Sequence, residues 1–339
     1  ITASGTGISY QWQLSTDGGT TYNNIAGANA ASYTVSSATN AMNGNRYRCV
    51  VNGTCTPAVT STAATLTVVA PATVTGQPAN AERCSGSDAT FTVTGTGSGI
   101  IYQWQLSTDG GANWTNISGA TNASLTVNAV TTGMNNYRYR CLLSNATCTN
   151  PVASAGALLT VRQLPTVLLS AAPLTSLLPG QTTTLTAAPS TSTGGTLTTA
   201  WYLNGSAFSN ATNSYIVNIE NTGSYQVRIQ EVFAGGLTCS NQSAVVTIDA
   251  TVSNKLFIFP SPNDGNFTVS YYNNGGASTQ RSISIFDSKG ARVFSGQFPV
   301  TGPYTLIPIN LQKANTGIYY VVIGDAAGKK LAEGKVHIH

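Results

Sequence analysis

The stretch Tyr10-Gln11-Trp12-Gln13-Leu14-Ser15-Thr16-Asp17-Gly18-Gly19 recurs letter for letter at residues 102–111. The tripeptide Tyr47-Arg48-Cys49 recurs as Tyr139-Arg140-Cys141 at the same offset of 92 residues. Long self-similarity at a fixed period is typical of an array of similar domains. The chain is therefore predicted to contain at least two copies of one domain.

The offset also suggests where the first copy begins. It places Ile1 opposite Val93, so the counterpart of residues 81–92 would lie upstream of residue 1. We therefore expect this chain to be the C-terminal part of a longer polypeptide.

Two further modules follow the repeated pair. A diverged third copy begins after Leu164-Pro165, with Trp201 in the place of Trp104 and Tyr225 in the place of Tyr139. A change of composition near Asn254 marks the fourth module, because all the lysines of the chain lie at or beyond Lys255. The predicted domains are residues 1–69, 70–163, 164–250 and 251–339.

The local pattern predicts strands throughout. Short alternating runs, such as residues 89–93 and 124–127, are separated by Gly, Asn and Asp clusters roughly every eight to twelve residues, which is typical of an all-β sandwich. In the second copy, Trp104 on an early strand is followed by Tyr139 and Cys141. This order resembles the immunoglobulin-like fold, with Tyr139 near the tyrosine-corner position. The predicted fold is thus a row of tandem immunoglobulin-like β-sandwiches.

The six cysteines are expected to be structural, in an oxidising compartment. Val93 stands where the strand B cysteine of an immunoglobulin domain would be, so the usual pairing is not available. Within the second repeat three pairings remain open, each leaving one thiol over, and the lone cysteine of the third repeat is expected to be unpaired or joined to another domain. The six are Cys49, Cys55, Cys84, Cys141, Cys148 and Cys239.

Charge and hydropathy exclude several classes of protein. Only 8% of the residues are charged, against roughly 25% in an ordinary globular chain. Residues 1–250 are balanced in charge and the net charge of +4 belongs to the fourth module, so a nucleic-acid footprint is not expected. No run of eighteen apolar residues is present, so no membrane-spanning helix is expected.

The fourth module reads as a separate β-sandwich. It opens with Phe259-Pro260-Ser261-Pro262-Asn263-Asp264-Gly265-Asn266-Phe267-Thr268-Val269, in which the prolines disfavour helix and Asn-Asp-Gly suits a tight turn before a strand. Further strands are predicted at residues 282–286, 317–323 and 334–339.

Three blocks of this module, residues 259–269, 283–293 and 311–321, resemble the type A C-terminal sorting domain of the Bacteroidetes type IX secretion system. The family usually has Tyr-Pro-Asn-Pro where this chain has Phe259-Pro260-Ser261-Pro262. The resemblance implies export to the outer cell surface or the medium, and recognition by the secretion channel and an outer-membrane shuttle barrel. It further implies removal of the domain and attachment of the cargo to surface lipopolysaccharide.

The resemblance also implies which residues the export machinery recognises. For each of them a purely structural role is the alternative, since glycines serve turns and the aromatic rings fill a core. The predicted recognition residues are Pro260, Asn263, Gly265, Phe267, Gly290, Gly317 and Tyr319.

Little else in the sequence suggests chemistry. His337 and His339 alternate on the last strand without convergent partners, and Asp17 and Asp109 supply one carboxylate per loop where calcium prefers six to eight oxygens. No Ser/His/Asp or Cys/His set can be assembled from two histidines confined to the last module. We therefore predict no catalytic residues, metal or cofactor, and no enzyme activity.

Tyr22 and Trp114 are the candidates for binding. They occupy matching places in the first two repeats, and Trp104 and Trp12 already fill the core position, so these rings are predicted to be exposed and able to stack on sugars. Packing within their own strand is the alternative.

Three functions remain open from the sequence. The first is a structural or adhesive surface protein that binds surfaces, glycans or other cells. The second is the accessory tail of a large secreted polysaccharide-degrading enzyme, and the third is a fibre subunit that self-associates by strand donation.

Overall fold

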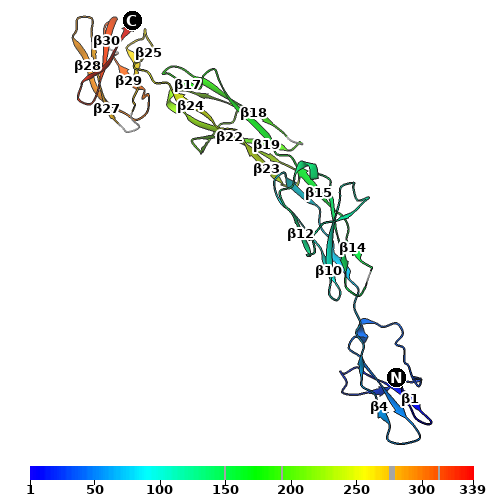
Figure 1. Ribbon diagram of the computed structural model, residues 1–339. Coiled ribbons are helices and arrows are strands. Elements are labelled where there is room, and N and C mark those ends of the chain that lie inside the picture. Colours follow the sequence, from blue (N-terminus) through cyan, green and yellow to red (C-terminus); the bar gives the residue numbers. More distant parts are fainter. Residues whose placement is uncertain (149, 192–193, 275–278, 312–313) are drawn as a thin grey trace. The chain divides into compact units, whose positions relative to one another are not determined.

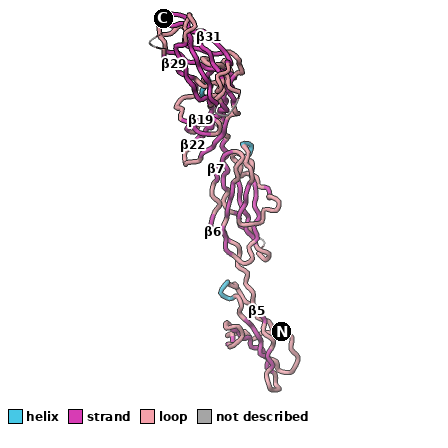
Figure 2. The backbone as a smooth tube through the Cα atoms, turned by 90° about the vertical axis from the view of Figure 1, so that its left-hand side faces the viewer, coloured by secondary structure: helices cyan, strands magenta, loops and turns pink. Residues whose placement is uncertain are grey.

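The computed structural model describes residues 1–148, 150–191, 194–274, 279–311 and 314–339 (Figure 1). The chain divides into two compact units, Ile1–Val161 and Arg162–His339. Strands dominate both, and the helical segments of the described residues are short 3₁₀ turns, drawn in cyan in Figure 2, at Asn40–Met42, Thr132–Met134 and Ile219–Asn221. The predicted all-β class is confirmed.

The second repeat is a complete sandwich. One sheet has the order β11-β10-β13-β15-β7, with β14 paired to β13, and the other layer consists of the pairs β12-β8 and β6-β9. This arrangement of strands is that of the immunoglobulin fold. The strands are β6 (Thr73–Gly76), β7 (Ala81–Cys84), β8 (Ala89–Thr92), β9 (Thr94–Thr96), β10 (Ile101–Ser107), β11 (Thr115–Asn116), β12 (Ser124–Val127), β13 (Arg138–Ser144), β14 (Val152–Ala153) and β15 (Ala157–Arg162).

Alternation along the strands builds the core of this sandwich. Trp104 is fully buried, and its indole Nε1 donates a hydrogen bond of 2.9 Å to the carbonyl oxygen of Asn122, just before β12. Phe91 of β8 stacks on Tyr139 of β13 with ring centroids 4.7 Å apart, which joins the two layers. The tryptophan and tyrosine singled out in the sequence therefore lie in the core.

The first repeat has one sheet, of order β2-β1-β3-β4 with β5 paired to β3. Residues 32–35, which match β12 at the offset of 92, form no strand. In the second repeat β12 pairs with β8. The strands described for the first repeat include no counterpart of β8, so this segment lacks the neighbour that β12 has. The strands are β1 (Ser9–Ser15), β2 (Asn23–Asn24), β3 (Arg46–Asn52), β4 (Val59–Thr60) and β5 (Ala64–Thr65).

The third repeat keeps the same plan with longer strands. A sheet of order β16-β18-β21 packs on a sheet of order β17-β24-β22-β19-β20, with β23 paired to β22. Trp201 is fully buried and donates to the carbonyl oxygen of Thr212, and the hydroxyl of Tyr225 donates to that of Asn221 as a tyrosine corner. The strands are β16 (Thr166–Ala172), β17 (Ser176–Leu177), β18 (Thr183–Ser190), β19 (Thr196–Leu203), β20 (Ser206–Phe208), β21 (Ser214–Val217), β22 (Gly223–Val232), β23 (Thr238–Gln242) and β24 (Val246–Ala250).

The C-terminal module is a smaller sandwich. Its sheets have the orders β25-β26-β29 and β28-β27-β30-β31, and one buried cluster that includes Phe267, Ile285 and Val321 lies between them. Each strand predicted from the sequence here is present. The strands are β25 (Leu256–Phe259), β26 (Asn266–Tyr271), β27 (Thr279–Phe286), β28 (Arg292–Val300), β29 (Ile307–Asn310), β30 (Gly317–Gly324) and β31 (Lys330–Ile338).

Tyr304 of this module is buried together with the core residues of the third repeat. Its hydroxyl donates a hydrogen bond of 2.8 Å to the carbonyl oxygen of Thr251, and its ring meets Phe257 edge to face at 5.7 Å. Tyr304 thus ties the C-terminal module to the segment that precedes it.

The cysteines differ from the expectation of a disulfide inside the second repeat. Cys84 and Cys239 are each disulfide-bonded, whereas Cys141 and Cys148 are free thiols. Cys141 packs among apolar residues that include Val93, so the core supplies no sulfur partner for it. In the first repeat Cys49 is buried and Cys55 is exposed, and both are free.

Candidate functional site

Asn263 connects the opening motif of the C-terminal module to the last strand. Its backbone N–H donates to the carbonyl oxygen of His337 at 3.0 Å, and its carbonyl oxygen accepts the N–H of His339 at 3.0 Å. Its side-chain amide donates to the carbonyl oxygen of Pro260 and accepts the N–H of Gly265, each at 2.8 Å. The two backbone bonds hold the last strand beside Asn263, and the two side-chain bonds hold the turn that carries it.

The other predicted recognition residues divide into core and turn positions. Phe267 and Tyr319 are buried, and the Tyr319 hydroxyl donates to the carbonyl oxygen of Asn315 at 2.8 Å. Gly265 and Gly290 have positive φ angles of 96° and 84°, which glycine adopts without steric cost. Most of the set therefore holds the fold together.

Pro260 and Gly290 are exposed, and Gly317 at the start of β30 is half-buried. Only these members of the predicted set are open to a partner. Recognition of the buried members by the export machinery stays a prediction.

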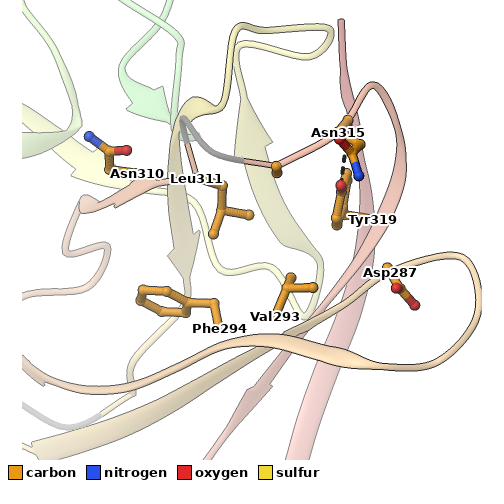
Figure 3. A pocket seen from close by; sticks show the side chains of 8 residues that line it. Asp287, Val293, Phe294, Asn310, Leu311, Asn315 and Tyr319 are labelled. Carbon is orange, nitrogen blue, oxygen red and sulfur yellow. Dashed lines mark hydrogen bonds between the residues drawn. The ribbon is translucent and has the colours of Figure 1, made fainter.

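An open cavity of about 520 Å³ lies beside these motifs (Figure 3). Its lining combines residues of the second and third sequence blocks with the end of β29. Figure 3 shows Leu311, Phe294 and Val293 forming one part of the wall, with Tyr319, Asn315 and Asp287 along the other. The lining residues are Asp287, Val293, Phe294, Asn310, Leu311, Ala314, Asn315 and Tyr319.

The cavity has a mixed lining of apolar and polar side chains, with Asp287 as the one charged residue among the described residues that line it. One carboxylate oxygen of Asp287, Oδ1, accepts the backbone N–H groups of Lys289 and Ala291 at 2.9 and 2.8 Å, which fixes the β27–β28 turn. No hydrogen bond among the described residues engages the second oxygen, Oδ2. The cavity can accordingly take an apolar side chain with a cationic or hydrogen-bonding end.

An arginine side chain lies over each of the two candidate glycan-stacking rings. The guanidinium of Arg48 lies 3.7 Å from the ring centroid of Tyr22, and that of Arg140 lies 4.3 Å from the ring centroid of Trp114. Trp114 is half-buried and its Nε1 donates to the carbonyl oxygen of Gly111. Stacking of sugars on these rings stays a prediction. These arginines belong to the repeated Tyr-Arg-Cys tripeptide, which was the one sequence signal for them.

The Asp-Gly-Gly loops are turns between β1 and β2 and between β10 and β11. Hydrogen bonds from the hydroxyl and backbone N–H of Thr21 hold the pKa of Asp17 well below its usual range. The backbone N–H of Asn113 has the same effect on the pKa of Asp109. In the described parts of the chain no group of three or more His, Cys, Asp or Glu side chains could hold a metal ion. No helix there is long and apolar enough to cross a membrane.

Residues 257–336 match the family described as the secretion system C-terminal sorting domain. This module is a C-terminal sorting domain. A sorting domain of this kind is handled by the type IX secretion machinery and marks its protein for the cell surface or the extracellular space. The chain is therefore a secreted surface protein.

The segments before the sorting domain match a second family. Residues 1–70 and 74–163 each match a domain of unknown function, DUF8696. No curated protein shows detectable similarity to the chain.

The solved structures that the chain matches include tandem immunoglobulin-domain proteins. The titin I-band fragment I67–I69 is 14% identical, covers 80% of this chain and 98% of its own, and has a TM-score of 0.32. Extracellular domains 3–5 of Drosophila OTK are 15% identical, cover 73% of this chain and 87% of their own, and have a TM-score of 0.33.

Proposed function

We propose that the chain belongs to a structural or adhesive protein of the outer cell surface, and that it is not an enzyme. In this proposal the immunoglobulin-like repeats are the displayed part and the sorting domain is the address for their export. The observation that carries the proposal is the sorting-domain match at residues 257–336, directly after a run of sandwiches with few charged residues.

We also infer that the secretion channel and the outer-membrane shuttle barrel recognise the folded sorting domain at the cavity beside Asp287. Support comes from its lining, because Asp287 and Val293 belong to the second sequence block while Leu311 and Tyr319 belong to the third. A lipopolysaccharide anchor on the exported repeats belongs to the same proposal.

Filling the cavity tests the recognition step. Val293 is 44% exposed and lines the cavity, so Val293→Trp would occupy it without disturbing the buried core. We expect this variant to be retained inside the cell, whereas Val252→Trp, at a residue that is 70% exposed and lies outside the cavity, is exported normally. Export of both variants at the native level, measured as surface-accessible protein, would contradict recognition at the cavity.

Adhesion of intact cells tests the function of the displayed repeats. Cells that lack the gene for this chain should lose attachment to polysaccharide-coated surfaces and keep their polysaccharide-degrading activity. Loss of that degrading activity with unchanged attachment would instead favour the accessory tail of a secreted enzyme.

A further inference from the structure

The outward face of the main sheet carries the same chain of side chains in each of the first two repeats. In the first repeat, Gln13 Nε2 donates to Asn24 Oδ1 at 2.8 Å, and Arg48 Nε donates to Gln13 Oε1 at 2.8 Å. The Arg48 guanidinium then lies on the ring of Tyr22, 3.7 Å from its centroid. We call these four residues the arginine platform of the first repeat.

The second repeat has a matching arginine platform at the offset of 92 residues. Gln105 Nε2 donates to Asn116 Oδ1 at 2.8 Å, Arg140 Nε donates to Gln105 Oε1 at 2.8 Å, and Arg140 lies on the ring of Trp114. Gln105 is only 9% exposed. A buried glutamine and an aromatic ring thus hold the arginine in one orientation.

The terminal N–H groups of the arginine in each platform are not engaged by the bonds described above. The hydrogen bonds above engage only Nε, and the terminal nitrogens of Arg48 and Arg140 donate to no group among the described residues. Both arginines are half-buried, so part of each side chain reaches the surface. A guanidinium with free terminal N–H groups matches the two oxygens of a carboxylate.

A second arginine reinforces the charge. Tyr139 and Cys141 of β13 are buried in the core, so Arg138 and Arg140, which alternate with them, share the opposite face. Arg46 and Arg48 occupy the matching places on β3.

Neighbouring acids do not neutralise these pairs. Of the seven arginines in residues 1–250, four lie on the two platform faces. The carboxylates of Asp17 and Asp109 are hydrogen-bonded within their own turns and form no ion pair with these arginines among the described residues. Each face therefore presents two arginines whose charges are not held in an ion pair with these acids.

The third repeat lacks the arrangement. Trp201 pairs with Val227 as Trp104 pairs with Cys141, which places Gln226 where the second repeat has Arg140. The platform is thus specific to the two repeats that share a family match, and the fold can form without it.

We propose that the arginine platforms bind the carboxylates of an acidic polysaccharide, a polymer of uronic acid residues. The paired arginines would hold the carboxylate, and the exposed amides of Asn24 and Asn116 would bond to sugar hydroxyls. Two matching sites in one chain suit a polymer whose charged groups recur along its length. This inference rests on the proposed adhesive function and names its ligand class.

Calorimetry with the purified full chain and polygalacturonate as the probe tests the inference. We expect Arg48→Gln together with Arg140→Gln to lower the affinity at least about tenfold, because each loss removes a charge-assisted pair of hydrogen bonds. The matched control is Arg228→Gln together with Arg292→Gln, which removes the same charge from exposed residues outside the platforms, and it should change the affinity by less than about twofold.

A second measurement needs no variant. The native chain should bind polygalacturonate and fail to bind the same polymer after reduction of its carboxyl groups to alcohols. Equal binding to the reduced polymer, an equal loss in the control variant, or no binding to polygalacturonate would each overturn the inference. Export and cell attachment are measured separately, so these results would leave the proposed surface function standing.

Discussion

Asn263 links the opening motif of the sorting domain to its last strand. The Asn-Asp-Gly turn was expected to start a strand, and it does, but the asparagine also binds the backbone of β31 from the far end of the module. Its side chain satisfies the buried N–H of Gly265, a group that water cannot reach in the folded module.

Asn263→Ala should therefore destabilise the sorting domain by about 1–3 kcal/mol, because it leaves a buried donor without a partner. Chemical unfolding of the full chain, followed by a probe in the C-terminal module, measures the change. The control is Asn254→Ala at an exposed residue, expected to stay within about 0.5 kcal/mol. Equal effects of the two substitutions would contradict the role given to Asn263.

The thiols should react in an order set by burial and bonding. Burial raises the pKa of Cys141 to about 11, so its thiolate is scarce in the folded protein below that pH and appears as the pH rises through it. At pH 7 a maleimide should label Cys55 and Cys148 in the native chain, Cys141 after unfolding, and Cys84 only after unfolding and reduction. Mass spectrometry of labelled peptides checks this, and native labelling of Cys84 would contradict it.

The sequence predicts the surroundings of some residues and not of others. The order of residue types predicts Trp104 in the core and Tyr139 near the tyrosine-corner position, and both side chains are buried. The environment of Trp114 could not be read in the same way, since Arg140 reaches it from another strand and depends on Gln105 for its orientation. The cysteine pairing was also out of reach, because pairing depends on distances that only the folded chain defines.

Strands and the turns between them were the most predictable part of the molecule. Period-two alternation between Gly and Asn clusters is a local signal, and it located β8, β12 and the strands of the C-terminal module. Residues 32–35 have the same local signal as β12 and form no strand. Sheet formation requires a partner strand, which no local pattern reports.

The corner before β30 offers a test at the level of one element. Tyr319→Phe removes the hydroxyl that bonds to the carbonyl oxygen of Asn315 and should cost about 1 kcal/mol in the free energy of unfolding. Its neighbour Tyr320 is 40% exposed with its hydroxyl unengaged by any described residue, so Tyr320→Phe should cost less than about 0.5 kcal/mol. Thermal unfolding of both variants decides, and a larger loss for Tyr320→Phe would refute the corner.

The arginine platforms and the export signal lie in different modules of the chain. The sandwiches before Asn254 supply a neutral surface with two arginine platforms, and the sorting domain holds all the lysines and the address for export. The family of the tail could be predicted because three blocks stand in a fixed order. The cavity beside Asp287 could not, because its wall combines residues that are distant in sequence.

Export of the full chain, with and without residues 251–339, tests the central claim most directly. A reporter fused to the N-terminus would be followed on the surface of cells with a working type IX channel and of cells without one. The account predicts surface reporter only when the tail and the channel are both present. Surface reporter without the tail, or with the tail in cells that lack the channel, would contradict it.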